Sequence, residues 1–446
     1  MMLLSLVGTA MATPWYVPDD GEIQEVIAQA VDGDEIFVDP GYYPYDTGDA
    51  IPIAVDLTIT GDATNPPSLP PLQIREADVT IRDVDFPWTD AHDDADQVTG
   101  VTVTDGSLDA SGLRMESLSG VGISGLDSDL TLTDCTFVGF SYAGIMAWGE
   151  DGVHDLTIIG GSFTEGRNTS VQTVQMAVVV DGTTFSDVPY GAALLTEEGS
   201  LDVTGAWFEA FSTDYMYGIS TYGSDVSISD TTFYNLPDSV STMAASLEDD
   251  PGTHTVQIRN VTIQNDSLRQ AAGGISASGF ASVDVDGLRV ENVGSSSRAG
   301  LYLNNTGEGA VNDATFTGGV KAMVVYTSGP VAISRSRFCD KHRRVFHLRP
   351  LRQLPRHHHR LGVHRKRRGR RDCHLHLRAH PPQQHLRRKR RHHGGDRRNP
   401  HRAHGSEHPF HRKWPGHPGL PTVGDDRKLQ SLVRQSQRRD VHLCNR

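Results

Sequence analysis

The residues with the clearest capacity for chemistry are clustered carboxylates in polar stretches of the chain. The largest cluster consists of Asp90, Asp93, Asp94 and Asp96. Carboxylate oxygens are ligands that Ca²⁺ prefers, so this cluster is a candidate calcium site. Its spacing matches no calcium-loop motif, and a solvated acidic turn is the simpler interpretation. A second pair, Asp249 and Asp250, has no Lys or Arg beside it in the sequence. Apart from calcium no cofactor is predicted, and no catalytic residue is assigned.

Six aromatic residues are candidates for stacking on sugar rings if they are exposed: Trp88, Trp148, Trp207, Tyr217, Tyr222 and Tyr302. Packing between repeats is the favoured interpretation of these side chains. Cys135 is the only cysteine before position 339 and occupies a slot that other repeats fill with small residues. A buried free thiol is therefore expected there, and cysteine usage predicts neither a disulfide framework nor a metal site.

The elements that must position these residues are copies of one pattern, of which Asp129 to Phe137 is an example. Its last position is Phe86, Met115, Phe137, Phe163, Phe185, Phe208, Phe233, Ile263, Val290, Phe316 and Phe338, at steps of 22 to 30 residues. Five residues earlier stand Ile81, Ala110, Leu132, Ile158, Val180, Val203, Ile228, Ile258, Val285, Val311 and Ile333. Seven residues earlier the position is again apolar, except at Gly309. Apolar positions two apart predict a short strand with one buried face.

Three residues before the last position, every copy except that with Arg335 has Asp, Asn or Gly, which tolerate a left-handed backbone and predict a corner. A second strand precedes most copies, as in Gly144-Ile145-Met146-Ala147. Such short strands must stack on neighbouring copies to bury their apolar faces. We therefore predict an all-β fold, a single-stranded right-handed parallel β-helix (solenoid) over residues 56–338.

Charge divides the chain into two unlike parts. Residues 1–338 hold 11 Lys and Arg against 49 Asp and Glu, a net charge of −38, whereas residues 339–446 hold 30 against 7, a net charge of +23. Composition alone identifies 339–446 as a basic His/Arg-rich disordered tail, which as a class could bind nucleic acid.

An out-of-frame translation is the favoured origin of this tail, so no nucleic-acid partner is predicted. Three near-identical quartets begin at Val363, Leu386 and Phe410, at steps of 23 and 24 residues, and Val363 follows Phe338 by 25. This is the period of the upstream repeat. With permitted codons read one base later, the first quartet becomes Phe-Thr-Gly-Asn, so the pattern indicates a frameshift near Asp340.

The N-terminal region resembles the cap of pectin-lyase-like β-helix proteins. Ile23, Val26, Ile27 and Ala30 share one face of a predicted amphipathic helix, and residues 33–43 read G-D-x-I-x-V-x-P-G-x-Y. The resemblance implies an N-terminal helix cap and first rung over residues 13–55. Before it, Met1 to Val7 and Ala10-Met11-Ala12 predict a signal peptide over residues 1–12, whose missing positive region favours a start further upstream.

The restored Phe-Thr-Gly-Asn and Gly273-Gly274-Ile275 are similar to the repeats of polymorphic outer-membrane proteins. That resemblance implies a secreted or cell-surface protein, at a bacterial outer membrane or extracellular, with an adhesin-like role. We expect a monomer with no transmembrane helix, whose partner is an extracellular carbohydrate or a surface protein.

The alternative is a polysaccharide lyase or glycoside hydrolase of the same fold. A lyase of this fold needs Arg or Lys as base, but residues 1–338 hold one Lys, Lys321, and scattered Arg, and the hydrolase signatures do not occur together. A non-catalytic role is therefore favoured. A frameshifted, non-functional product is the second alternative.

Overall fold

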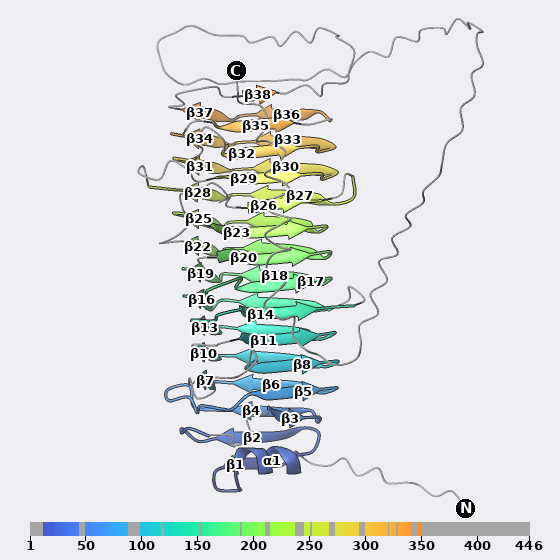
Figure 1. Ribbon diagram of the computed structural model, residues 1–446, viewed down its shortest axis with the longest axis vertical. Helices are drawn as coiled ribbons and strands as arrows, with labels where there is room; N and C mark the ends of the chain where they lie inside the picture. The colour runs from blue at the N-terminus through green and yellow to red at the C-terminus, as the bar shows by residue number, and fades with distance from the viewer. Residues whose placement is uncertain are drawn as a thin grey trace, which may run out of the picture. The chain divides into compact units, whose positions relative to one another are not determined.

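The computed structural model describes residues 12–43, 50–87, 99–116, 120–150, 154–187, 190–209, 215–236, 245–249, 252–266, 273–293, 299–319, 321–326, 329–339 and 346–348. All of them belong to the first of two compact units, residues 1–381. The described residues form a parallel β-solenoid built from three sheets, with one short helix (Figure 1).

Sheet A has 14 strands. They are β1 (Pro14–Val17), β2 (Asp34–Val38), β4 (Leu57–Thr60), β6 (Asp78–Arg82), β9 (Ser107–Ser111), β12 (Asp129–Thr133), β15 (Asp155–Ile159), β18 (Ala177–Asp181), β21 (Ser200–Thr204), β24 (Asp225–Ser229), β27 (Thr255–Arg259), β30 (Ser282–Asp286), β33 (Glu308–Asn312) and β36 (Val331–Ser334).

Sheet B has 11 strands of three residues each. They are β7 (Asp85–Pro87), β10 (Arg114–Glu116), β13 (Thr136–Val138), β16 (Ser162–Thr164), β19 (Thr184–Ser186), β22 (Trp207–Glu209), β25 (Thr232–Tyr234), β28 (Thr262–Gln264), β31 (Arg289–Glu291), β34 (Thr315–Thr317) and β37 (Arg337–Cys339).

Sheet C has 13 strands. They are β3 (Ile51–Ile53), β5 (Leu72–Arg75), β8 (Val101–Thr104), β11 (Val121–Leu126), β14 (Ala143–Trp148), β17 (Val171–Val174), β20 (Tyr190–Glu197), β23 (Tyr215–Tyr222), β26 (Ala245–Glu248), β29 (Ile275–Ser278), β32 (Leu301–Asn304), β35 (Met323–Tyr326) and β38 (Phe346–Leu348). The strand β38 pairs with β35 and lies beyond the predicted end of the solenoid at residue 338.

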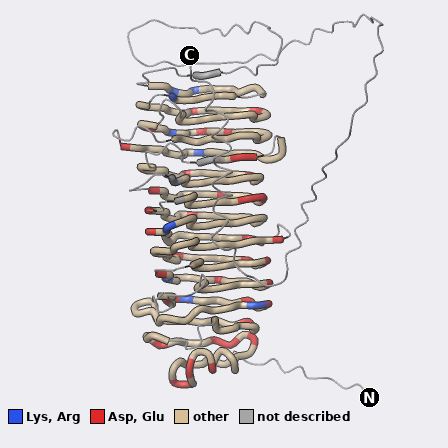
Figure 2. The backbone as a smooth tube through the Cα atoms, in the orientation of Figure 1, with Lys and Arg blue, Asp and Glu red and all other residues tan. Residues whose placement is uncertain are grey.

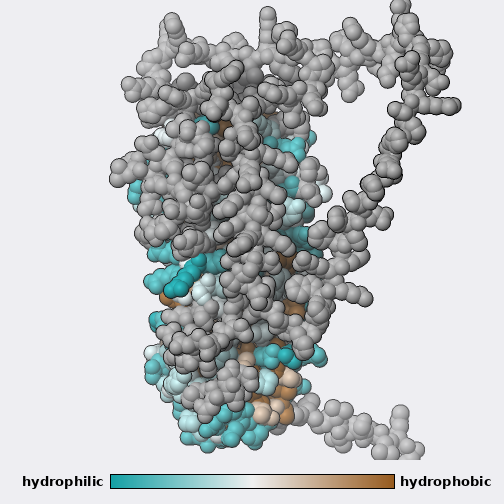
Figure 3. Space-filling model, in the orientation of Figure 1, coloured by the Kyte–Doolittle hydropathy of each residue, from teal (hydrophilic) through white to brown (hydrophobic). Residues whose placement is uncertain are grey.

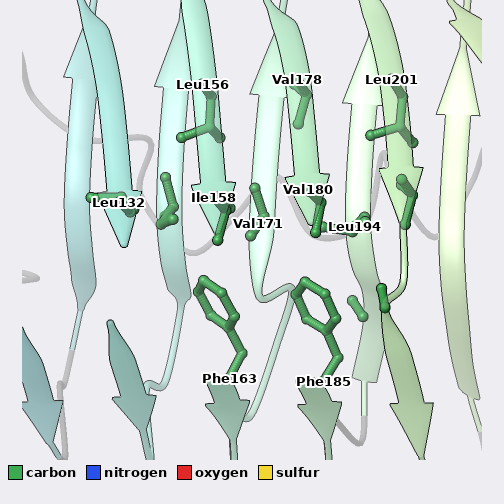
Figure 4. Close-up of a cluster of buried hydrophobic side chains, with 14 of the residues drawn as sticks. Leu132, Leu156, Ile158, Phe163, Val171, Val178, Val180, Phe185, Leu194 and Leu201 are labelled. Carbon is green, nitrogen blue, oxygen red and sulfur yellow. The ribbon is translucent and has the colours of Figure 1, made fainter. Parts of the chain in front are cut away.

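From β6 onward the chain visits sheets A, B and C in turn, and each strand pairs in parallel with the equivalent strand of the next rung. In β12 and β15, for example, Leu130 pairs with Leu156 and Leu132 with Ile158. The predicted apolar columns are the partners in this pairing. The column that contains Ile81 and the column that contains Phe86 are both buried throughout. Figure 4 shows side chains of the two columns meeting inside the solenoid.

Aromatic rings stack along the inner side of sheet B. Phe137, Phe163, Phe185, Phe208 and Phe233 form a continuous stack with ring centroids 4.5 to 5.2 Å apart. The rungs repeat at the spacing of neighbouring strands, about 4.8 Å, which is close to the spacing of offset-stacked rings. The same periodicity therefore satisfies the backbone hydrogen bonds and the aromatic contacts together.

The predicted corner between sheets A and B is confirmed. All eleven residues at that position have positive φ, from 47° to 72°. The value of 47° belongs to Arg335, whose guanidinium donates to both carboxylate oxygens of Asp313 one rung earlier, from Nε at 2.8 Å and from Nη2 at 2.7 Å. This ion pair accompanies the one residue type in the column that disfavours a left-handed backbone.

The N-terminal region contains the predicted helix, α1 (Ile23–Gln29), which buries Ile23, Val26 and Ile27. It packs against β1, β2 and β3 at the N-terminal end of the described solenoid (Figure 1). The carboxylate of Asp34, only 2% exposed, joins the segments around it. It accepts hydrogen bonds from the Thr13 N–H (2.7 Å), the Trp15 Nε1–H (2.9 Å) and the Val31 N–H (3.0 Å).

Charge and hydropathy on the outside follow the composition. In Figure 2, Asp and Glu are scattered along the described rungs, and Lys and Arg occur singly among them. Figure 3 shows a mainly hydrophilic described surface from this side, with hydrophobic residues gathered near the N-terminal rungs. The described residues contain no helix that is both long and apolar enough to cross a membrane.

Candidate functional site

The outer face of sheet C brings together aromatic and acidic side chains from different rungs. Alternate residues of each strand point into the core, as Leu194 in β20 and Ile219 in β23 do, so the residues between them face outward. Strand pairing places the last outward residue of each strand in one column. That column, from β14 to β35, is Trp148, Val174, Glu197, Tyr222, Glu248, Ser278, Asn304 and Tyr326.

Tyr222 is the most open aromatic side chain of this column. It is 48% exposed and lies in register between Glu197 and Glu248. Further along the face, the rings of Tyr302 and Tyr326 lie 5.5 Å apart at an interplanar angle of 53°. An aromatic ring that is open on one face offers an apolar surface, and the phenol adds a hydrogen-bonding group.

Trp148 marks the other end of the column. It packs, together with Tyr142, against a small cluster of buried residues, Val121, Ala143 and Met146, that is separate from the main core. Met146 is only 2% exposed although it lies between two inward-facing residues of β14. At this point, therefore, side chains of a second apolar cluster cover the outer face of sheet C.

Two carboxylates flank Tyr222 one rung away on either side. Burial raises the pKa of the Glu197 carboxyl, and the neighbouring charge of Glu198 raises it further. Burial also raises the pKa of Glu248, although part of that side chain is exposed to solvent. Glu197 and Glu248 lie on strands two rungs apart, and such strands are about 10 Å from each other.

His254 lies between two carboxylates at the corner from sheet C to sheet A. Its Nδ1 is 3.4 Å from Asp225 Oδ2, and its Nε2 is 3.8 Å from Asp249 Oδ1. The side chain of Asp249 is 1% exposed. No Lys or Arg stands near Asp249 in the sequence, but His254, five residues later, lies against its carboxylate.

The contact between His254 and Asp225 has a counterpart elsewhere in the solenoid. His154 Nδ1 lies 3.3 Å from Asp129 at the equivalent corner, and in both rungs the Asp accepts a hydrogen bond from the backbone N–H that follows the histidine. Burial opposes ionisation of Asp225, but the hydrogen bonds from Thr255 and His254 hold its pKa below the usual value. The recurrence favours a role in joining rungs over a role in catalysis.

The six aromatic candidates do not share the predicted environment. None of the five that the structure describes belongs to the main core. Trp207 is 39% exposed on sheet B and Tyr222 is exposed on sheet C, whereas Trp148, Tyr217 and Tyr302 are half-buried. Packing between repeats accounts for part of the Trp207 environment, because its ring lies 5.8 Å from that of Tyr234 in the next rung, but Trp207 and Tyr222 both keep an exposed surface. Trp88 lies outside the described residues.

The remaining candidates are resolved as follows. Asp90, Asp93, Asp94 and Asp96 lie outside the described residues, as does Asp250. Within the described ranges, no group of three or more His, Cys, Asp or Glu side chains is placed to hold a metal ion. Cys135 is a free, buried thiol as predicted, and burial raises its pKa to about 11.

Comparisons with known proteins bear on the fold. No family model matches the chain, and no curated protein matches its sequence. Similar solved structures are right-handed parallel β-helix proteins of the pectin-lyase-like type, the resemblance that the N-terminal residues predict.

Three of these structures are a mannuronan C-5 epimerase A-module from Azotobacter vinelandii, a family 28 exopolygalacturonase from Yersinia enterocolitica and a surface adhesin of Streptococcus pneumoniae. Each is 12% identical to this chain. The TM-scores are 0.43, 0.41 and 0.41, with coverage of 72%, 73% and 75% of this chain and 98%, 79% and 93% of the other. Similarity at this level carries no argument about activity or ligand.

Proposed function

We propose that this protein is a secreted or cell-surface β-solenoid that binds extracellular carbohydrate without cleaving it, as an adhesin does. The single observation that carries the proposal is the exposed ring of Tyr222 in register between two carboxylates on the outer face of sheet C. An open aromatic ring can stack on the apolar face of a sugar, and carboxylates accept hydrogen bonds from its hydroxyl groups.

The charge of the outer face favours a neutral glycan over an acidic one. From β8 to β35, the outward positions of the described sheet C strands include no Lys or Arg. Residues 1–338 carry a net charge of −38, which repels polyanions at low salt. A lyase acting on uronates would need a basic residue near the bound sugar, and the one Arg or Lys on the outer face of the described sheet C strands is Arg75, which ends β5, six strands before the strand of Tyr222.

The test is binding of neutral oligosaccharides to the full chain, measured by isothermal titration calorimetry. Tyr222→Ala should weaken binding by about tenfold, because an aromatic contact contributes roughly 0.5–1.5 kcal/mol beyond area burial. Val179→Ala, which removes an equally accessible apolar side chain from sheet A (42% exposed), is the matched control and should bind normally. Equal binding by the two variants would contradict the proposal.

A glycoside hydrolase is the second candidate, because Glu197 and Glu248 both have raised pKa values and flank the same tyrosine. An inverting enzyme needs a protonated carboxylic acid and a carboxylate about 6.5–9.5 Å apart. We expect no new reducing ends when neutral polysaccharides are incubated with the protein. Release of reducing ends that Glu197→Gln or Glu248→Gln abolishes would replace the binding proposal with hydrolysis.

Several further features belong to the same proposal. We propose a right-handed coil whose N-terminal end is closed by α1, export directed by residues 1–12 to a bacterial outer membrane or the extracellular space, and a monomeric protein. The basic segment 339–446 is proposed to be an out-of-frame translation, which would make the chain as written a damaged form of a longer solenoid.

A further inference from the structure

Trp207 stands on the outer face of sheet B at a position where the fold does not need an aromatic residue. The first residue of each three-residue strand points outward, and the register pairs Trp207 with Thr184 in β19 and Thr232 in β25. The central residue, Phe208, fills the core. Threonine satisfies the same position in both neighbouring rungs, so a 39% exposed indole is not explained by packing.

The indole is held in place by contacts on its own face of the sheet. Its Nε1–H donates to Glu209 Oε2 at 3.1 Å, and its ring centroid lies 5.8 Å from that of Tyr234 in the next rung, at an interplanar angle of 35°. Glu209 is the register partner of Tyr234. Two aromatic rings and one carboxylate are therefore fixed on a rigid sheet before any ligand arrives, which lowers the entropic cost of binding.

The arrangement has the chemistry of a platform for a sugar ring. The C–H bonds on one side of a pyranose form an apolar surface that suits the electron-rich face of an indole or phenol. Its hydroxyl groups need hydrogen-bonding partners at the edge of that surface. The edge here holds the Glu209 carboxylate, the Thr184 and Thr232 hydroxyls and, in the following rung, Gln264.

Other ligand classes fit less well. A quaternary ammonium group or a lysine side chain is usually enclosed by aromatic rings on several sides, whereas these two rings lie side by side on an open sheet. A polyanionic glycan would meet the Glu209 carboxylate in a segment whose net charge is −38. The chemistry that remains is a neutral, hydroxyl-rich ring.

We propose that Trp207, Tyr234 and Glu209 form a second carbohydrate-binding site, specific for neutral glycans, on a different sheet from the Tyr222 site. Trp207 and Tyr222 lie on different sheets of one rung, since Trp207 begins sheet B strand β22 and Tyr222 ends sheet C strand β23, which follows it. Trp207 supplies the stacking surface, Tyr234 extends it across one rung, and Glu209 both orients the indole and accepts hydrogen bonds from the sugar.

The experiment measures binding of cellohexaose, xylohexaose and hexagalacturonate to the full chain in the Tyr222→Ala background, so that the sheet C site contributes little. We expect a neutral hexasaccharide to bind there, and Trp207→Ala to weaken that binding at least tenfold. Glu209→Gln should weaken it less, about threefold, because the amide still offers an acceptor. Thr262→Ala, on the outer face of the same sheet two rungs away, is the control and should bind as the background does.

The outcomes separate this site from the Tyr222 site. If Tyr222→Ala has no effect but Trp207→Ala abolishes binding, the sheet B site stands and the sheet C proposal fails. Equal binding by Trp207→Ala and its background would overturn the sheet B site, as would a preference for hexagalacturonate or for a lysine-rich peptide over both neutral sugars. Circular dichroism of Trp207→Ala should match that of the background, since its neighbours in the column are threonines.

Discussion

At the scale of single residues, the face on which a side chain lies decides its contribution to the fold. Ile228 in β24 is completely buried and pairs with Val203 and Ile258 of the adjacent rungs, whereas Ser227 beside it faces outward. The two positions are adjacent in sequence, and their side chains point to opposite faces of the strand. They therefore test the register of the whole column.

We predict that Ile228→Asp lowers the free energy of unfolding by more than about 4 kcal/mol, because a carboxylate would be buried among apolar side chains with no partner. Ser227→Asp should change it by less than about 0.5 kcal/mol. Urea denaturation of both variants checks this prediction. Comparable losses from the two substitutions would show that the assignment of faces is wrong.

The positions of the buried residues could be predicted from the sequence, because apolar residues recur there with the repeat. The contacts of several outward-facing residues could not. The column of Ile81 and the left-handed corner at Asp83 follow from residue type alone. The pairing of Tyr222 with Glu197 and Glu248 depends on the sheet C register. Loops of unequal length separate these strands, so the spacing of residues in the sequence does not predict that register. The same is true of His254, which contacts Asp249 through a turn.

At the scale of elements, the N-terminal strands and helix depend on one carboxylate. Asp34 begins β2 and accepts hydrogen bonds from the segment before β1, from Trp15 within β1 and from the residue that follows α1 closely, Val31. The hydrogen bond from the Trp15 side chain, followed by that from the Thr13 N–H, holds the pKa of Asp34 below its usual value. Ionised Asp34 is thus favoured by folding.

We predict that Asp34→Asn destabilises the N-terminal rungs by about 2 kcal/mol at pH 7, since charge-assisted hydrogen bonds are lost and an amide N–H₂ meets backbone donors. A lowered folded-state pKa gives stability that is present above the unfolded-state pKa, near 4, and is lost as the pH falls through the folded-state value. The gap in Tm between wild type and variant should therefore narrow between pH 5 and pH 2.

Thermal melts followed by circular dichroism across that range provide the measurement. Glu35→Gln, the next residue of β2, removes a carboxylate that makes none of these contacts and serves as control. A gap in Tm that stays constant with pH would show that the ionised form of Asp34 contributes no stability.

At the scale of the whole molecule, the most consequential prediction concerns the reading frame. The quartets at Val363, Leu386 and Phe410 keep the period of the solenoid in a segment with no apolar pattern. We predict that resequencing across codons 335 to 345 reveals a frameshift near codon 340. Translation of the sequence with one base inserted or deleted there should encode at least three more rungs with Phe in the aligned position.

The opposite result is equally clear. If the present frame is intact and no shifted frame restores the repeat, residues 339–446 are a basic segment in their own right. Binding of that segment to DNA with a steep dependence on salt would then support the nucleic-acid alternative.

The in-register pairing of successive rungs also has a mechanical consequence. Backbone hydrogen bonds between rungs run along the solenoid axis, so a force that separates the first described rung from the last acts on one rung boundary at a time. With 22 to 30 residues per rung, each detached rung would release about 75–100 Å of extended chain. Stretched in optical tweezers, the molecule should lengthen in a staircase of such steps, and a single cooperative rupture would mean that the rungs are coupled far beyond their nearest neighbours.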